Sequence, residues 1–376
     1  MTLVSKIMSR LGVSFGWFGI VCLALPALNI RLSAEVEAPV LRILNWSGFI
    51  QLDDSLPEDL PIEERSPVLS SFASKNGCTV EYTEYDEPAE LARMVMTLPN
   101  YFDVIVAGRK EMMELQSIGV VEKLDFGKLQ NYRHIGREYT ERMGSPLNNI
   151  SIPYLLGTTG IAYRKDLVNA PIDSWVDFFE PHSSMKGKLG LTADKNLAFS
   201  LSLLSLGYHF QSDDADELRN AAVRINRLNQ SGFFGIVSSN IKLVEQSLNS
   251  GEIAMAIMYS GDVLSAMERN PNIGYVVPVE GSEGYTDLVC LNRRSDNRDL
   301  AYQFLDYLMD PEVAADNSIY LNYASPNHAA VELIRKRAPE LIENPAIYTP
   351  ESIQGKLYEI SRSSDEVTRY WAQIFR

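Results

Sequence analysis

The sequence predicts an α/β protein made of two lobes, and three observations point to this class. The chain has 376 residues, which is more than one ordinary hydrophobic core holds. Short apolar stretches alternate with amphipathic stretches of helical period along its whole length. The composition, with 45% hydrophobic and 22% charged residues, is that of a globular protein and excludes the disordered and collagen-like classes.

The first part of the chain predicts strands and helices in strict alternation. We expect strands at 40–44, 79–85 and 102–107, and helices at 66–76, 87–98 and 110–118. Ser66 and Pro67 are typical of a helix start, and Gly77 is typical of a helix end. This order implies parallel strands flanked by helices.

The mixture of predicted strands and helices continues beyond Pro153, and the sequence has no repeat of the length that solenoid proteins show. We expect strands at 160–163, 189–191, 253–258, 275–277 and 287–291, and helices at 174–179, 196–206, 215–228, 241–249, 261–269, 299–309, 311–318, 328–337 and 364–375. The space between two such lobes is the expected ligand site.

Residues 1–34 have the pattern of a secretory signal peptide. Lys6 and Arg10 precede an uncharged apolar run at 11–28, after which come polar Asn29 and Arg31 and then Leu32-Ser33-Ala34. We expect cleavage near Ala34 and an exported protein; an uncleaved membrane anchor is the alternative.

The charge and the counts of metal-binding residues exclude several classes. The net charge of −15 argues against a nucleic-acid partner. An acidic protein attracts cations, although such acidity more often serves solubility alone. Three cysteines and four scattered histidines exclude a cysteine-rich metal site or a disulfide scaffold. Cys78 and Cys290 both lie in apolar, strand-like runs, so we expect two buried thiols, although pairing after export stays open.

No catalytic motif stands out. The sequence has no metalloprotease helix, phosphate-binding glycine loop or nucleophile elbow, and the stretch from Gly157 to Gly160 is too short for a dinucleotide loop. A hydrolytic carboxylate pair stays open because acids are plentiful, but nothing selects one. We therefore expect a binding protein with no catalytic residue, no metal and no cofactor.

Aromatic residues occur at the ends of the predicted strands, where α/β sheets bind ligands. Trp46, Ser47 and Phe49 follow the first strand, Tyr259 follows 253–258, Tyr285 stands before Asp287, and Tyr323 lies in a turn. Aromatic faces with a carboxylate suit an elongated organic cation, because rings cover methylenes and attract ammonium groups. The alternative is that each ring only packs under a loop.

The order of several short motifs resembles the periplasmic spermidine/putrescine-binding proteins of polyamine uptake systems. The resemblance runs from about Val40 to Phe375. Its motifs are Leu44-Asn45-Trp46, Tyr101-Phe102-Asp103-Val104-Ile105-Val106, Ser151-Ile152-Pro153-Tyr154 with Gly157-Thr158-Thr159-Gly160-Ile161, Ser174-Trp175-Val176-Asp177, Lys186-Gly187-Lys188-Leu189 and Tyr323-Ala324-Ser325-Pro326-Asn327-His328-Ala329-Ala330.

The resemblance implies a two-lobed periplasmic binding protein fold of the type II-like kind. Each lobe has a mixed sheet flanked by helices, and the ligand cleft is at the hinge. The expected boundaries are a signal peptide at 1–34, one lobe at 35–150 with 288–330, and the other at 151–287 with 331–376. The implied ligand-binding residues are Trp46, Ser47, Phe49, Asp194, Tyr259, Tyr285, Asp287 and Tyr323.

The sequence also departs from the family pattern. Gly48 stands where an acid or polar residue is common, Leu197 replaces a Glu, and Gly108-Arg109-Lys110 replaces a Ser-Thr-Tyr-like segment. One amine-holding end is therefore expected to have lost acid and gained positive charge. The chain also has an extra acidic segment at 51–65, which we expect to be either a solvated loop or a lid or partner-binding surface.

The resemblance implies a monomeric periplasmic protein that captures a polyamine or related organic cation for an inner-membrane ABC-type permease. Two alternatives stay open. The protein could sense polyamines for a membrane signalling protein, or the diverged cleft could bind a different small ligand. Arg109 and Lys110 favour an anion there, whereas Asp287 opposes one.

Overall fold

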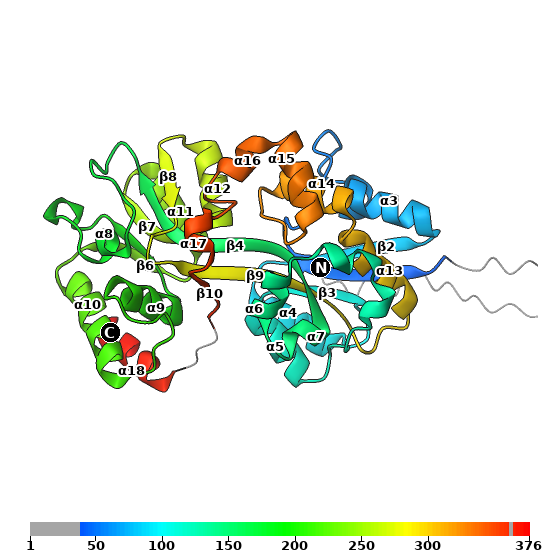
Figure 1. The fold of residues 1–376 in the computed structure, drawn as a ribbon, viewed down its shortest axis with the longest axis horizontal. Coiled ribbons are helices and arrows are strands. Elements are labelled where there is room, and N and C mark those ends of the chain that lie inside the picture. Colours follow the sequence, from blue (N-terminus) through cyan, green and yellow to red (C-terminus); the bar gives the residue numbers. More distant parts are fainter. Residues whose placement is uncertain (1–37, 361–363) are drawn as a thin grey trace, which may run out of the picture. The chain divides into compact units, whose positions relative to one another are not determined.

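The computed structural model describes residues 38–360 and 364–376, so the predicted signal peptide lies outside the described residues. Its main sheet has the strand order β2-β1-β3-β9-β4-β7-β5-β6, with β8 beside β4 and β10 beside β9 (Figure 1). The strands are β1 (Val40–Trp46), β2 (Thr79–Tyr85), β3 (Val104–Ala107), β4 (Ser151–Arg164), β5 (Leu189–Thr192), β6 (Phe234–Ser238), β7 (Met255–Tyr259), β8 (Ile273–Val276), β9 (Ser282–Leu291) and β10 (Leu357–Tyr358).

The first lobe is built on parallel strands, as the alternating pattern predicts. Strand β1 pairs in parallel with β2 and β3, and β9 joins antiparallel to β3. The helices of this part are α2 (Ile62–Arg65), α3 (Pro67–Asn76), α4 (Pro88–Thr97), α5 (Arg109–Ser117), α6 (Arg137–Met143), α7 (Leu147–Ile150) and α13 (Arg298–Leu308). Their apolar faces bury two clusters of side chains, among them Phe72, Phe304, Tyr85 and Leu91.

The ends of helix α3 could be predicted because its start and stop residues make the expected local contacts. The Ser66 hydroxyl accepts a hydrogen bond from the backbone N–H of Leu69 at 3.3 Å, and Pro67 occupies the first helical position. Gly77 ends the helix in the left-handed conformation, with φ of 60°, which favours a residue without a Cβ.

The second lobe combines strands β5 to β8 with its own helices and core. Strand β5 pairs in parallel with β6 and β7, and β4 runs antiparallel to β7 and β8. The helices are α8 (Trp175–Phe179), α9 (Lys195–Ser205), α10 (Ala215–Gln230), α11 (Ile241–Ser250), α12 (Ser260–Arg269) and α18 (Asp365–Ile374). Trp175, Phe178, Phe179 and Phe199 are fully buried in its core.

Strands β4 and β9 run through both lobes (Figure 1). Strand β4 pairs with β9 between Ser151 and Thr158 and with β7 from Thr159 onward, while β9 pairs with β3 from Leu288 onward. Both strands are longer than the sequence pattern predicted, because glycines and polar residues interrupt their apolar runs. This antiparallel pair connects the two lobes.

The segment from 309 to 356 lies above the first lobe and reaches α12 of the second lobe in Figure 1. It holds α14 (Pro311–Leu321), α15 (His328–Arg337), α16 (Pro339–Glu343) and α17 (Glu351–Gln354). The acidic insert at 51–65 packs against α14. The Gln51 backbone N–H donates to Asn317 at 2.7 Å, and the Tyr320 hydroxyl donates to Asp54 at 2.9 Å. One side of the insert is thus anchored, while most of its acids stay exposed.

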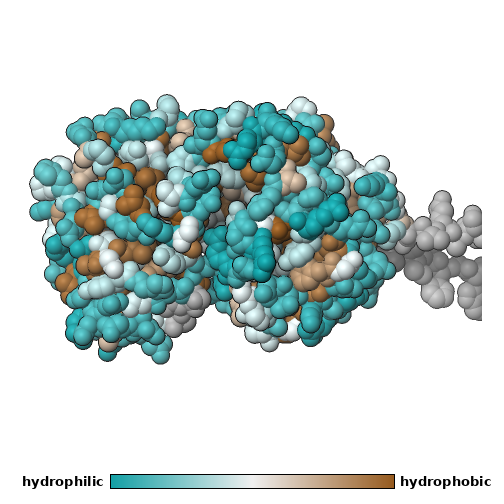
Figure 2. All heavy atoms as spheres, in the orientation of Figure 1, coloured by the Kyte–Doolittle hydropathy of each residue, from teal (hydrophilic) through white to brown (hydrophobic). Residues whose placement is uncertain are grey.

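The face of the molecule in Figure 2 is mainly hydrophilic, with hydrophobic residues in small separate groups. No helix among the described residues is long and apolar enough to cross a membrane. Cys78 and Cys290 are buried and do not form a disulfide, which confirms the prediction of two buried thiols. Burial raises the pKa of the Cys290 thiol to about 12.

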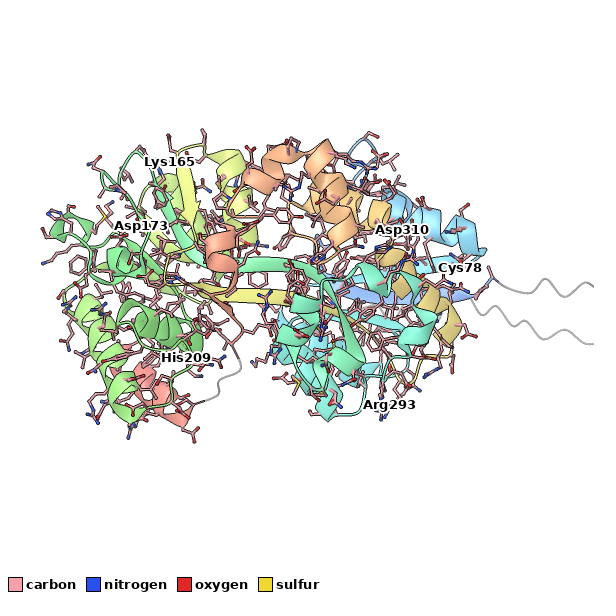
Figure 3. All side chains as sticks on the ribbon, in the orientation of Figure 1. Cys78, Lys165, Asp173, His209, Arg293 and Asp310 are labelled. Atoms are coloured by element: carbon pink, nitrogen blue, oxygen red, sulfur yellow. The ribbon has the colours of Figure 1, made fainter. Side chains whose placement is uncertain are left out.

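The histidines have separate local contacts. His209, labelled in Figure 3, lies 5.6 Å from the Tyr358 ring, and His328 contacts Glu138 at 2.7 Å. The His182 ring accepts a hydrogen bond from the Ser184 backbone at 3.2 Å. Within residues 38–360 and 364–376, no three metal-ligating side chains are placed to hold an ion.

Candidate functional site

Strand β9 places Tyr285 and Asp287 on one face of the sheet, because side chains two residues apart in a strand point the same way. Tyr285 lies opposite Gly157 of β4 in the strand register. Its ring occupies the space above Gly157 so closely that a Cβ there would overlap it. This explains the glycine in the middle of β4.

Aromatic side chains from the first lobe form a continuous row. The ring of Trp46, at the end of β1, lies 4.3 Å from the ring of Tyr85 at the end of β2 and 6.4 Å from that of Phe49. Phe49 in turn lies 5.2 Å from Tyr323. All four follow or end strands or lie in turns, so the first-lobe residues named from the sequence are brought together. Tyr85, whose ring packs against that of Trp46, was not named from the sequence.

The second lobe contributes Tyr259, at the end of β7. Its ring meets that of Tyr285 edge to face at 5.7 Å. The Ser260 hydroxyl lies 3.3 Å from the Tyr285 hydroxyl and accepts a hydrogen bond from the Thr158 backbone at 3.2 Å. Gly261 leaves room for the Tyr323 hydroxyl, which a Cβ would displace. Residues of both lobes therefore meet around Tyr285.

Asp287 is a buried carboxylate without a cationic partner among the described residues. It is 7% exposed. Burial, followed by the negative charge of Glu111, raises its pKa to about 7, and the indole N–H of Trp46 opposes this rise. The indole nitrogen itself is buried and makes no hydrogen bond of normal geometry within the described part. An unpaired buried acid beside aromatic rings favours a cationic ligand.

Asp262 is a further acid near these residues, and it was not predicted from the sequence. It lies in the first turn of α12, three residues after Tyr259. Burial raises its pKa to about 6, and Lys242 opposes this rise. Its negative charge raises the pKa values of Tyr285 and Tyr323, so it lies near both. The available signal was an acid one helical turn after a strand-end aromatic residue.

Asp194 and Ser47 lie at the margins of this group. Asp194 is exposed and caps α9, where its carboxylate accepts backbone hydrogen bonds from Asn196 at 2.9 Å and Leu197 at 3.1 Å. Its charge still raises the pKa of Tyr259, so it remains close to the aromatic residues. Ser47 is exposed in the turn after β1, and its backbone N–H donates to the Tyr85 carbonyl at 3.0 Å.

The structure removes the basis for the expected gain of positive charge. Arg109 forms an ion pair with Glu359, and its guanidinium also donates to the Met143 carbonyl at 2.7 Å. The Lys110 side chain is 80% exposed and lies 4.0 Å from Glu114 on the same helix. The first charge is neutralised and the second faces solvent.

The expected loss of acid is also incomplete. Leu197 is fully buried in the core of the second lobe, so a carboxylate at this position would not face the ligand. At the turn where Gly48 stands, the backbone N–H of Gly48 donates to the Glu84 carboxylate at 2.8 Å. Glu84 thus supplies an acid from β2 where the chain has a glycine.

The sequence is similar to those of known polyamine-binding proteins. The chain is 28% identical over 365 residues to the putrescine-binding periplasmic protein SpuD of Pseudomonas aeruginosa, covering 91% of this chain and 94% of SpuD. It is 29% identical over 383 residues to the putrescine-binding periplasmic protein PotF of Escherichia coli, covering 95% and 96%.

Solved structures share the fold. The spermidine/putrescine ABC transporter substrate-binding protein PotD of Streptococcus pneumoniae, crystallised with calcium and HEPES, matches with a TM-score of 0.79 at 24% identity, over 90% of this chain and 98% of PotD. The Tp0655 lipoprotein of Treponema pallidum matches with a TM-score of 0.70 at 19% identity, over 90% and 100% of the two chains. These likenesses confirm the predicted two-lobed periplasmic binding protein fold.

A sequence model of the bacterial extracellular solute-binding proteins matches residues 68–349, which is most of the chain. The match begins in α3 and ends after α16, so it includes both lobes and the crossing strands. The chain belongs to the family of bacterial extracellular solute-binding proteins.

Proposed function

We propose that this protein captures a linear polyamine or a related organic cation in the periplasm and delivers it to an ABC-type permease in the inner membrane. The observation that carries the proposal is Asp287, a buried carboxylate without a cationic partner in the described part of the chain, which lies close enough to Trp46, Tyr285 and Tyr323 for their electrostatics to be coupled. An ammonium group would neutralise this charge, and the rings would cover the methylenes of the ligand.

The relatives support this assignment, because they are named as putrescine-binding and spermidine/putrescine-binding periplasmic proteins. Those names describe periplasmic binding proteins, which is the role that this proposal assigns to the chain. The ion pair between Arg109 and Glu359 weakens the alternative of an anionic ligand, because this guanidinium already has a carboxylate partner.

The proposed ligand-binding set is Trp46, Ser47, Phe49, Asp194, Tyr259, Tyr285, Asp287 and Tyr323, to which we add Asp262. We place the first lobe at 35–150 with 288–330 and the second at 151–287 with 331–376. Closure would bend the paired strands β4 and β9 and bring the first-lobe aromatic row and Tyr259 of the second lobe onto the ligand. Export through the signal peptide at 1–34 and a monomeric state belong to the same proposal.

A thermal-shift screen of the purified protein tests the proposed function. The set of ligands contains diamines, polyamines, amino acids and small anions. A ligand that binds only the folded state raises its stability by about 2.7 kcal/mol at a hundredfold excess over the dissociation constant. We expect the melting temperature to rise with diamines or polyamines. A rise with anions alone would contradict the proposal.

A further inference from the structure

Glu283 is a second buried acid on the same face of β9 as Tyr285 and Asp287. The three side chains occur at alternate positions of one strand and therefore form an acid–aromatic–acid row. Glu283 is 9% exposed. Its carboxylate accepts a hydrogen bond from the Thr159 hydroxyl on β4 at 2.6 Å, which fixes its position at the second-lobe end of the row.

The surroundings of Glu283 are acidic. The charges that act on it come from Asp194 at the start of α9 and from Glu359 just after β10, and Glu359 is itself paired with Arg109. The neighbouring side chains of Tyr259 and Tyr275 are uncharged. No cation forms an ion pair with Glu283 in residues 38–360 or 364–376. Burial is the main reason that its pKa rises to about 7. A carboxylate held in this way is costly for the protein unless a cation reaches it.

The two acids of the row are too far apart for one ammonium group. Four residues of extended strand separate the Cα atoms of Glu283 and Asp287 by about 13 Å, whereas an ammonium–carboxylate hydrogen bond spans about 2.8 Å. A linear chain with an amine at each end can contact both acids. Its methylenes would then cross the ring of Tyr285, which lies between them.

We propose that Glu283 is a second ligand-binding carboxylate and holds the far amine of a linear diamine or polyamine whose near amine binds Asp287. The inference rests on the proposed function and deepens it. Neither the sequence pattern nor the family resemblance pointed to Glu283. It provides acid on the second-lobe side, close to Asp194, where Leu197 provides none.

The test compares amines that carry one or two charges. Titration calorimetry at pH 8 measures the affinities of putrescine, cadaverine and butylamine for the wild type and for Glu283→Gln, with butylamine measured by displacement of a bound diamine. We expect the ratio of diamine to monoamine affinity to fall at least tenfold in the variant. A purely structural role of Glu283 would lower both affinities together and leave the ratio unchanged.

Two further variants keep the test decisive. Asp103→Asn is the matched control, because Asp103 is a buried acid, 2% exposed, that is hydrogen-bonded to Ser295 at 2.6 Å in the first lobe; the affinity ratio should not change. Glu283→Asp, which is one methylene shorter, should shift the preference toward a longer diamine if Glu283→Gln does not fold. A wild type that binds no amine refutes the proposed function, whereas diamine binding with an unchanged ratio in both Glu283 variants refutes only the role of Glu283.

Discussion

Replacing Asp287 with Asn should weaken ligand binding while making the ligand-free protein more stable. The substitution keeps the shape of the side chain and removes its charge. Breaking a desolvated carboxylate–ammonium pair costs roughly 2–5 kcal/mol, so the affinity for a diamine should fall by a factor of roughly thirty to several thousand.

The stability of the ligand-free protein should change in the opposite direction. Burial and Glu111 raise the pKa of Asp287 from 3.8 to about 7, which corresponds to a penalty on the order of 4 kcal/mol when the carboxylate is charged above pH 7. The buried amide that replaces it costs about 1–3 kcal/mol for its unmade hydrogen bonds. The variant should therefore be more stable than the wild type by on the order of 1–3 kcal/mol at pH 8.

Calorimetric titration and chemical denaturation at pH 8 measure the two effects separately. If Asp287 only supports the fold, the variant should unfold more easily and bind as tightly as the wild type. Unchanged affinity for diamines would remove Asp287 from the site whatever its stability. Weaker binding together with lower stability would refute the reasoning about the buried charge.

Three other predictions follow from the same geometry. Trp46→Ala should reduce ligand affinity by roughly 1–2 kcal/mol, because the cation–π contact and the apolar cover are lost. The tryptophan fluorescence of the wild type should also change when the ligand binds. A lowered melting temperature with normal affinity would show that Trp46 only packs in the fold. Leu197→Glu should lower the melting temperature without improving spermidine binding, because Leu197 is fully buried in the second core; improved binding would contradict this placement. The free energy of unfolding of the ligand-free protein should fall as pH rises from about 4 to about 7, because Asp287 and Glu283 have raised pKa values and the folded state binds more protons than the unfolded state in this range. Chemical denaturation across this range should show a weaker pH dependence when both residues are replaced by their amides. An unchanged pH dependence in that double variant would contradict the prediction.

Much of the fold could be predicted from the sequence because its signals are local. Helix α3 has its serine cap, its proline and its left-handed glycine within one segment, and helix α8 has a complete capping box at Ser174 and Asp177. Strand β6 was missed because its residues are only half-buried, so they show neither a continuous apolar run nor a clear alternation. Strand β10 has two residues, which is too short for any pattern.

The candidate site was only partly predictable because charge balance depends on partners distant in sequence. The strand-end aromatic residues and Asp287 could be predicted as ligand-binding residues, because the ends of strands in α/β sheets are where ligands bind. The partner of Arg109 is Glu359, 250 residues further along the chain, and no spacing rule connects them. Glu283 lay inside a stretch that did not read as a strand, so its alignment with Asp287 became apparent only when the length of β9 was known.

The most direct test of polyamine binding is a calorimetric titration of the purified wild-type protein with putrescine and spermidine at pH 6 and pH 8. We predict saturable binding of one ligand per protein, tighter at pH 8, since Asp287 and Glu283, with pKa values of about 7, must be charged to hold the amines. Protons should be released on binding near pH 7. The absence of saturable binding of either amine at millimolar concentration, at both pH values, would contradict the account.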